Sequence, residues 1–168
     1  MLKHINRYAG TLRSRRPEAT LAVLQDLLGY RILATEAHRT RLVPDSPDSS
    51  PDTIDVIPAP AGEPLARLGI GGVHHIAFRS SAQDHCRFFH HVASAGHRIT
   101  PAQERIYFRS LYFREPGGVL FEVATDDPGF TADEPLDSLG SSLRLPPWLE
   151  SHRKDIEATL PPLPSHRP

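Results

Sequence analysis

The chain has 168 residues, a formal net charge of −1, 39% hydrophobic residues and 23% charged residues. This length suits one ordinary domain or two small half-units that share a core, and the balanced charge argues against disorder and against a nucleic-acid partner. The chain contains neither an apolar leader nor an apolar run long enough for a membrane helix, so we expect a soluble, cytoplasmic protein with no membrane partner. A single cysteine, Cys86, excludes an intramolecular disulfide, and we interpret it as a packed helix residue.

The first part of the chain predicts the order strand, helix and three strands. Pro17 to Leu28 is typical of a helix, because Pro17 suits a first helical position and leucines recur at intervals of three and four. Gly29 should end this helix. A strand is expected before the helix at Tyr8 to Leu12, and three strands are expected after it at Tyr30 to Ala34, Arg39 to Val43 and Thr53 to Ile57.

The second part predicts the same order. A strand at Val73 to Phe78 precedes a helix at Ser81 to Ala95, and three strands follow. The last two strands are expected at Tyr107 to Phe113 and Val119 to Thr125, on either side of the turn Glu115-Pro116-Gly117-Gly118. We interpret the charged residues of this hairpin, Arg109, Arg114 and Glu115, as a surface or salt-bridge set and not as catalytic groups.

An internal repeat supports this division. The run Gly29-Tyr30-Arg31-Ile32 recurs 67 positions later as Gly96-His97-Arg98-Ile99. The same offset pairs Tyr8 with His75 and Asp55 with Glu122, so we infer a duplicated unit.

These patterns predict an α+β fold of two βαβββ modules, residues 1–62 and 63–127, followed by a C-terminal tail. The tail, residues 128–168, is expected to pack on the domain. It should carry a short helix from about Pro147 to Leu160, because Pro147 suits a first helical position and prolines follow the helix.

Glu122 is the unusual residue of the last strand. Alternation places it on one face with Leu120 and Ala124, and a carboxylate with apolar neighbours is costly to bury unless it meets a cation or a metal. Alternation in the predicted strand Val73 to Phe78 places His75 on the same face of the sheet as Glu122, away from the helix, and His74 on the opposite face. Imidazole nitrogen and carboxylate oxygen suit iron, manganese, zinc or nickel, and the alternative is a hydrogen-bonded histidine beside a solvated glutamate.

Three runs resemble the hydroquinone-type ring-cleaving dioxygenases of the vicinal oxygen chelate, or glyoxalase and bleomycin-resistance, superfamily. They are V-H-H-I-A-F from Val73, R-I-Y-F-R-S-L-Y-F-R-E-P-G-G-V-L-F-E-V-A-T-D-D-P-G-F from Arg105, and L-R-L-P-P-W-L-E from Leu143. The resemblance is specific from about Gly71 to Leu163 and implies a metal-dependent extradiol-type dioxygenase that opens a hydroquinone or catechol ring with O2.

The resemblance also implies roles for five residues. The family holds Fe(II), or in some members Mn(II), with two histidines and one glutamate, so His75 and Glu122 correspond to two of the three metal ligands. Arg105 and Tyr112 correspond to catalytic residues on the substrate side, and His74 corresponds to a residue that supports the ligands. An arginine in this place would favour the phenolate form of the substrate.

Members of this family are about twice as long and take their first metal histidine from an N-terminal half, so this chain resembles their C-terminal half. The third ligand could be Tyr8 or Asp55 by the repeat, His4 as the nearest histidine, or a residue of another chain. We expect a homodimer, because a chain of half length must cover sheet edges that longer relatives cover themselves.

Two other functions stay open from the sequence. A glyoxalase-like isomerase or transferase would need a redox-inert metal and more carboxylate ligands, which Asp55 leaves possible. A non-catalytic small-molecule-binding module, as in bleomycin-resistance proteins, would need no complete metal site. Metal analysis of the purified protein would distinguish the three functions. Bound iron favours the dioxygenase, bound zinc or nickel favours the isomerase or transferase, and the absence of metal favours the binding module.

Overall fold

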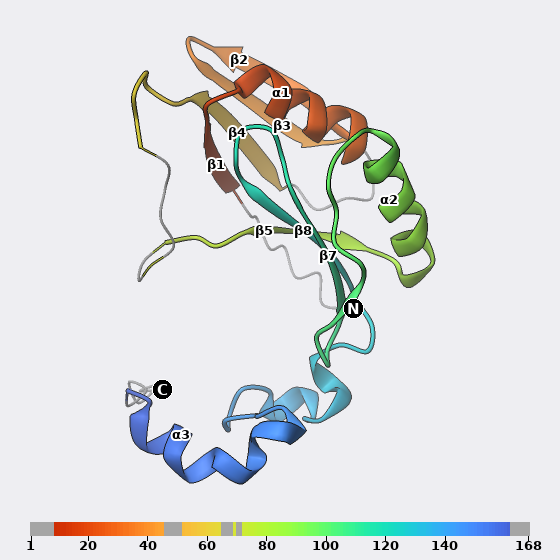
Figure 1. The fold of residues 1–168 in the computed structure, drawn as a ribbon, viewed down its shortest axis with the longest axis vertical. Coiled ribbons are helices and arrows are strands. Elements are labelled where there is room, and N and C mark those ends of the chain that lie inside the picture. Colours follow the sequence, from red (N-terminus) through yellow and green to blue (C-terminus); the bar gives the residue numbers. More distant parts are fainter. Residues whose placement is uncertain (1–8, 46–51, 65–68, 70–71, 162–168) are drawn as a thin grey trace. The chain divides into compact units, whose positions relative to one another are not determined.

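The computed structural model describes residues 9–45, 52–64, 69 and 72–161. The chain divides into two compact units, Met1–Asp127 and Pro128–Pro168. The first unit contains two four-stranded sheets with their helices, and the second contains short helices (Figure 1). No helix in the described ranges is long and apolar enough to cross a membrane.

The first sheet has the strand order β1-β4-β3-β2. β1 runs parallel to β4, and the other neighbouring strands are antiparallel. The predicted helix is confirmed, but only its first part, α1, is an α-helix, and the next five residues are wound as a π-helix, η1. The elements are β1 (Ala9–Ser14), α1 (Pro17–Ala22), η1 (Val23–Leu27), β2 (Tyr30–Glu36), β3 (Arg39–Pro44) and β4 (Thr53–Pro58).

The second sheet repeats this arrangement with the strand order β5-β8-β7-β6. Its predicted helix is confirmed as α2, where the Ser81 hydroxyl caps the N-terminus by accepting a hydrogen bond from the Asp84 backbone N–H at 3.1 Å. The elements are β5 (Ile76–Ser80), α2 (Ala82–Ser94), β6 (Gln103–Glu104), β7 (Arg109–Arg114) and β8 (Leu120–Thr125). The predicted α+β class with two βαβββ modules is therefore confirmed.

The first strand of the second module begins later than the sequence predicts. β5 starts at Ile76, not at Val73, and its pairing with β8 begins where Ile76 lies opposite Phe121. β8 itself begins at Leu120, so residues before His75 have no paired strand beside them in this sheet. The two histidines therefore lie just before the strand.

One hydrophobic core extends through both modules. Its fully buried members include Leu24, Leu42, Val92, Phe113 and Phe121. These side chains come from the helices and from one face of each sheet, which leaves the opposite face, here called the open face, to polar and charged residues.

Cys86 corrects one prediction about this core. It lies on α2 but is exposed, because the buried positions of that helix are those of His85 and Val92. His85 is buried beside β8, where its Nε2 lies 3.0 Å from the Val123 carbonyl oxygen.

The second unit is built from short helices with a buried glutamate. The predicted C-terminal helix is present as two consecutive segments, a 3-10 helix followed by α3. Glu134 is 7% exposed, and the guanidinium of Arg144 lies 3.1 Å from its carboxylate. The packing of this tail on the domain stays a prediction. The elements are η2 (Phe130–Ala132), η3 (Leu136–Ser138), η4 (Pro147–His152) and α3 (Arg153–Thr159).

A buried carboxylate joins the two modules. Glu115, in the turn between β7 and β8, is 2% exposed, so the part of the prediction that placed it on the surface is wrong. It accepts hydrogen bonds from the Thr20 hydroxyl of α1 at 2.6 Å and from the backbone N–H groups of Gly117 and Val119 at 2.7 Å each. Ser14 of β1 adds a contact, with its hydroxyl 2.7 Å from that of Thr20. The carboxylate is buried because the first module supplies a donor that the turn alone lacks.

Substitutions in this contact should destabilise the fold. Glu115→Gln places an amide donor against groups that already donate, and a Cβ on Gly117 would lie 2.0 Å from the Ser14 hydroxyl oxygen. We expect Glu115→Gln and Gly117→Ala each to lower the free energy of unfolding by about 1–3 kcal/mol, measured by urea denaturation. Glu104→Gln, at an exposed position of β6, is the matched control and should change it by less than about 0.5 kcal/mol. Equal stabilities for Glu115→Gln and the control would show that the contact does not hold the modules together.

Candidate functional site

Glu122 is the centre of the polar cluster on the open face of the second sheet. It is 3% exposed and lies on β8, between Tyr112 on β7 and Ala77 on β5. The hydroxyls of Ser110 and Tyr112 both donate to its Oε1, from Tyr112 at 2.7 Å. The other oxygen, Oε2, lies 2.6 Å from Nε2 of His75. The structure thus brings together the two residues predicted as metal ligands.

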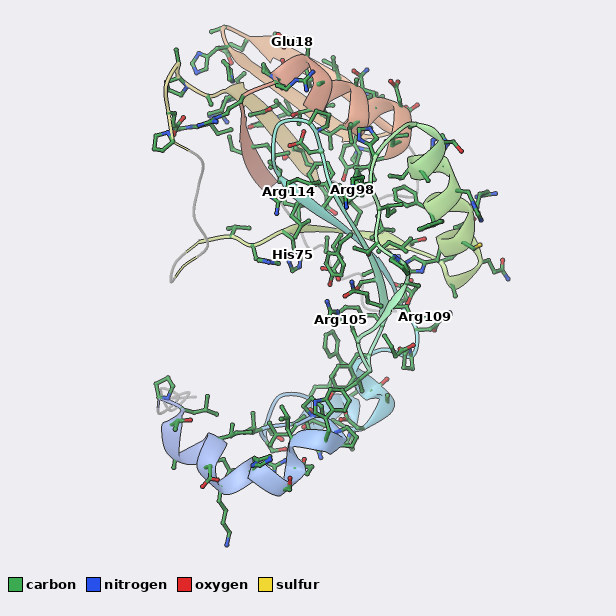
Figure 2. The ribbon with its side chains drawn as sticks, viewed as in Figure 1. Glu18, His75, Arg98, Arg105, Arg109 and Arg114 are labelled. Carbon is green, nitrogen blue, oxygen red and sulfur yellow. The ribbon has the colours of Figure 1, made fainter. Side chains whose placement is uncertain are left out.

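The two neighbouring histidines lie together before β5. Their Nδ1 atoms are 2.9 Å apart and their rings are nearly perpendicular, with centroids 5.2 Å apart. The prediction that they point to opposite faces is wrong, because strand alternation does not apply to residues that precede the strand. The His75 side chain is 34% exposed, and Figure 2 shows it beside β5. His75 therefore remains accessible although Glu122 is buried.

Arg105 lies against the ring of Tyr112. Its guanidinium carbon is 5.4 Å from the ring centroid, within the range of a cation–π contact, and its Nη2 donates to Gln103 Oε1 at 2.8 Å. The next residue, Ile106, has a φ of 70°, which is strained for a β-branched side chain. The Tyr107 N–H donates to the Arg105 carbonyl oxygen at 2.8 Å, so the backbone reverses within three residues at this point.

Asp55 does not join His75 and Glu122. It lies on β4 of the first sheet, where Arg41 donates to its two oxygens at 2.7 and 2.9 Å and Arg39 donates at 2.7 Å. The hydrogen bonds from Arg41, assisted by Arg39, lower the pKa of Asp55 to about 2 despite its burial. Within the described residues, no group of three His, Cys, Asp or Glu side chains could hold a metal ion. Asp55 is therefore wrong as a third ligand, and the other candidates, His4 and Tyr8, lie outside the described residues.

The strand pairing also corrects the repeat. Thr11 lies opposite Asp55 in the first sheet, and Ala77 lies opposite Glu122 in the second. Equivalent residues are therefore 66 positions apart in the first strands of the modules and 67 positions apart in the last strands. The counterpart of His75 is consequently Ala9 and not Tyr8. A one-residue difference of this kind moves each side chain to the other face of a strand.

The two modules carry different partners around equivalent acids. Arg41 lies opposite Asp55 as Tyr112 lies opposite Glu122. In both modules, the residue two positions earlier on the same strand is the second hydrogen-bond donor to the acid. The acid meets two guanidinium groups in the first module and two hydroxyls in the second.

A recess of about 880 Å³ lies elsewhere in the first unit. Its lining includes Leu28, which follows η1, and Phe88 and His91 of α2, and contains neither His75 nor Glu122. The polar cluster around Glu122 is therefore not part of this recess.

Comparison with solved structures defines the class of the fold. A mutant fosfomycin resistance protein, FosX of Listeria monocytogenes, solved with Mn(II) and 1S,2S-dihydroxypropylphosphonic acid, has a TM-score of 0.54 at 17% identity over 73% of this chain and 90% of that one. The glyoxalase/bleomycin resistance protein/dioxygenase domain of a Frankia species has a TM-score of 0.54 at 18% identity over 77% of this chain and 96% of that one. The chain has the vicinal oxygen chelate fold.

Sequence comparison then identifies its relatives as ring-cleaving dioxygenases. MhqE of Bacillus subtilis strain 168, assigned as a ring-cleaving dioxygenase, is 41% identical over 90% of this chain and 49% of its own length. The chlorohydroquinone/hydroquinone 1,2-dioxygenase of Sphingobium indicum is 39% identical over 55% of this chain and 29% of its own length. A crystal structure of a B. subtilis protein assigned as a dioxygenase has a TM-score of 0.80 at 36% identity, over 94% of this chain and 50% of that one.

The chain is thus a homologue of these ring-cleaving dioxygenases, as the sequence runs indicated. It spans about half the length of MhqE. A scan against protein-family models finds no match.

The ion pairs of Asp55 predict a pH dependence of stability. Because its pKa falls from 3.8 to about 2 in the folded protein, the carboxylate contributes stability that is present above about pH 4 and is lost as the pH falls toward 2. We expect the native chain to exceed Asp55→Asn by roughly 1–2 kcal/mol at pH 5 in urea denaturation, and this difference should shrink toward pH 2. A difference that stays constant between pH 5 and pH 2.5 would contradict the assignment.

Proposed function

We propose that the chain is part of a metal-dependent ring-cleaving dioxygenase that acts on a hydroquinone- or catechol-type aromatic diol with O2. The observation that carries the proposal is the pairing of His75 Nε2 with Glu122 Oε2 at 2.6 Å on the open face. Two donor atoms of the types that bind Fe(II) or Mn(II) converge there. The homology to ring-cleaving dioxygenases supports this reading of the pair.

The surroundings of the pair fit a metal site. With an ion on Nε2, the proton of the His75 ring would sit on Nδ1 and be donated to Nδ1 of His74, 2.9 Å away. Metal-binding histidines generally donate their second ring N–H in this way, which fixes the tautomer and the ring orientation. His74 is thus proposed as the residue that orients His75.

The third protein ligand is proposed to come from residues 1–8, which include His4 and Tyr8, or from another chain. The described residues supply only two donors at this place. A ligand from another chain would make the site depend on a dimer, so the expected homodimer stays part of the proposal.

The substrate is proposed to lie on the side of Arg105 and Tyr112. An ion held by His75 and Glu122 would supply the redox chemistry that links the diol to O2. Arg105 would stabilise the phenolate form of the diol by its permanent charge. The Tyr112 hydroxyl donates its proton to Glu122 at 2.7 Å, so its oxygen would accept a hydrogen bond from a hydroxyl of the diol.

One observation favours a second function. Because the described residues bring only two donors together, the chain could be a binding module that holds an aromatic ligand without chemistry. The isomerase or transferase alternative needs a further carboxylate ligand, and Asp55 does not supply it because it forms ion pairs with Arg39 and Arg41.

Metal loading tests the proposal. His75→Ala and Glu122→Ala should each remove most of the Fe(II) or Mn(II) bound under anaerobic conditions, because each removes one of few ligands. Arg105→Ala should keep the metal but weaken hydroquinone binding, measured by anaerobic calorimetry, because its proposed role is toward the substrate anion.

His38→Ala, at an exposed turn, is the control and should bind metal as the native chain does. Circular dichroism would verify that each variant is folded. Native metal content in folded His75→Ala and Glu122→Ala proteins would refute the site and favour the binding module.

A further inference from the structure

Ser110 is buried beside Glu122 and was not among the residues singled out by sequence. Its side chain is completely buried on β7, on the same strand face as Tyr112, two positions later. Its hydroxyl donates to Glu122 Oε1, the same oxygen that accepts from Tyr112. Two donors on one oxygen occupy both of its lone-pair directions.

We infer that Ser110 is a positioning residue that fixes Glu122 so that one oxygen alone, Oε2, is presented on the side of His75. With Oε1 held by two hydroxyls, the carboxylate cannot turn both oxygens toward an ion without breaking a buried hydrogen bond. Glu122 would thus bind a metal through a single oxygen. This inference rests on the proposed metal site.

The first module shows the opposite outcome at equivalent positions. There Arg39 occupies the place of Ser110, and together with Arg41 it takes both oxygens of Asp55. Both oxygens of that acid thus accept hydrogen bonds from guanidinium groups. The residue pair on the third strand of each module therefore decides whether the acid forms a closed ion pair or keeps an oxygen for a cation.

The chemistry of the position also points to a role for the hydroxyl. Ser110 stands beside Leu111 on a strand with no solvent access at this point, where an apolar side chain of similar size would avoid the cost of burying a hydroxyl. The donated bond to Glu122 compensates for that cost. Serine is not among the residues enriched in strands, so local preference does not explain its presence.

Mn(II) binding to the full chain, followed by electron paramagnetic resonance, tests the inference. Ser110→Ala should lower Mn(II) affinity by about 10-fold to 100-fold, the range for loss of a residue that orients a metal ligand. The spectrum of the bound Co(II) form should also change, because the freed carboxylate can turn. Ser110→Thr keeps the hydroxyl and should restore affinity and spectrum toward those of the native chain.

The outcomes separate this inference from the proposed function. If His75→Ala abolishes Mn(II) binding while folded Ser110→Ala retains native affinity and spectrum, the positioning role is wrong and the metal site stands. A Ser110→Thr protein no better than Ser110→Ala would likewise overturn it. If Ser110→Ala does not fold, Tyr112→Phe removes the other donor to Oε1, and native metal affinity and spectrum in that variant would overturn the inference. Native Mn(II) binding by His75→Ala would instead refute the metal site itself.

Discussion

The buried carboxylate of Glu122 is the constraint on which the open face of the second module depends. A carboxylate this deep in a sheet is tolerated only when its oxygens are hydrogen-bonded or paired with a cation. The register of β7 against β8 places Tyr112 directly opposite, and the chain just before β5 brings His75 to the remaining oxygen. The geometry of the site is therefore a consequence of strand pairing, because a shift of one residue would remove these groups from the open face.

The two modules have diverged around a common plan. Each has the same strand order and an acid on its last strand, but two arginines pair with the acid in one module and two hydroxyls donate to it in the other. The ion pairs of Asp55 thus stabilise the first module, while the second module keeps His75 accessible beside Glu122. Glu115 joins the two modules through its hydrogen bond with Thr20, and one hydrophobic core contains residues of both modules.

The sequence predicted the elements well because hydrophobic periodicity, proline and glycine act locally. It also paired His75 with Glu122, since alternation places an acid on one face of a strand and the duplicated order places the first and last strands side by side. The repeat matched Tyr8 to His75 with a single offset, but the strand pairing gives an offset of 66 for the first strands and 67 for the last strands. Glu115 and Cys86 were misjudged because their burial depends on which neighbour packs against them. Ser110 could have been found from its spacing of two from Tyr112, which puts both hydroxyls on the face of Glu122.

The central claim is that His75 Nε2 and Glu122 Oε2 form one edge of a metal site. A crystal structure of the Mn(II)-loaded chain, with anomalous scattering at the manganese absorption edge, tests it most directly. The account predicts one strong peak at about 2.0–2.3 Å from both atoms, with Glu122 Oε1 still bound by Ser110 and Tyr112 and a third donor visible beside the ion. A peak at another place on the chain, or no peak at saturating Mn(II) with His75 still hydrogen-bonded to Glu122, would contradict it.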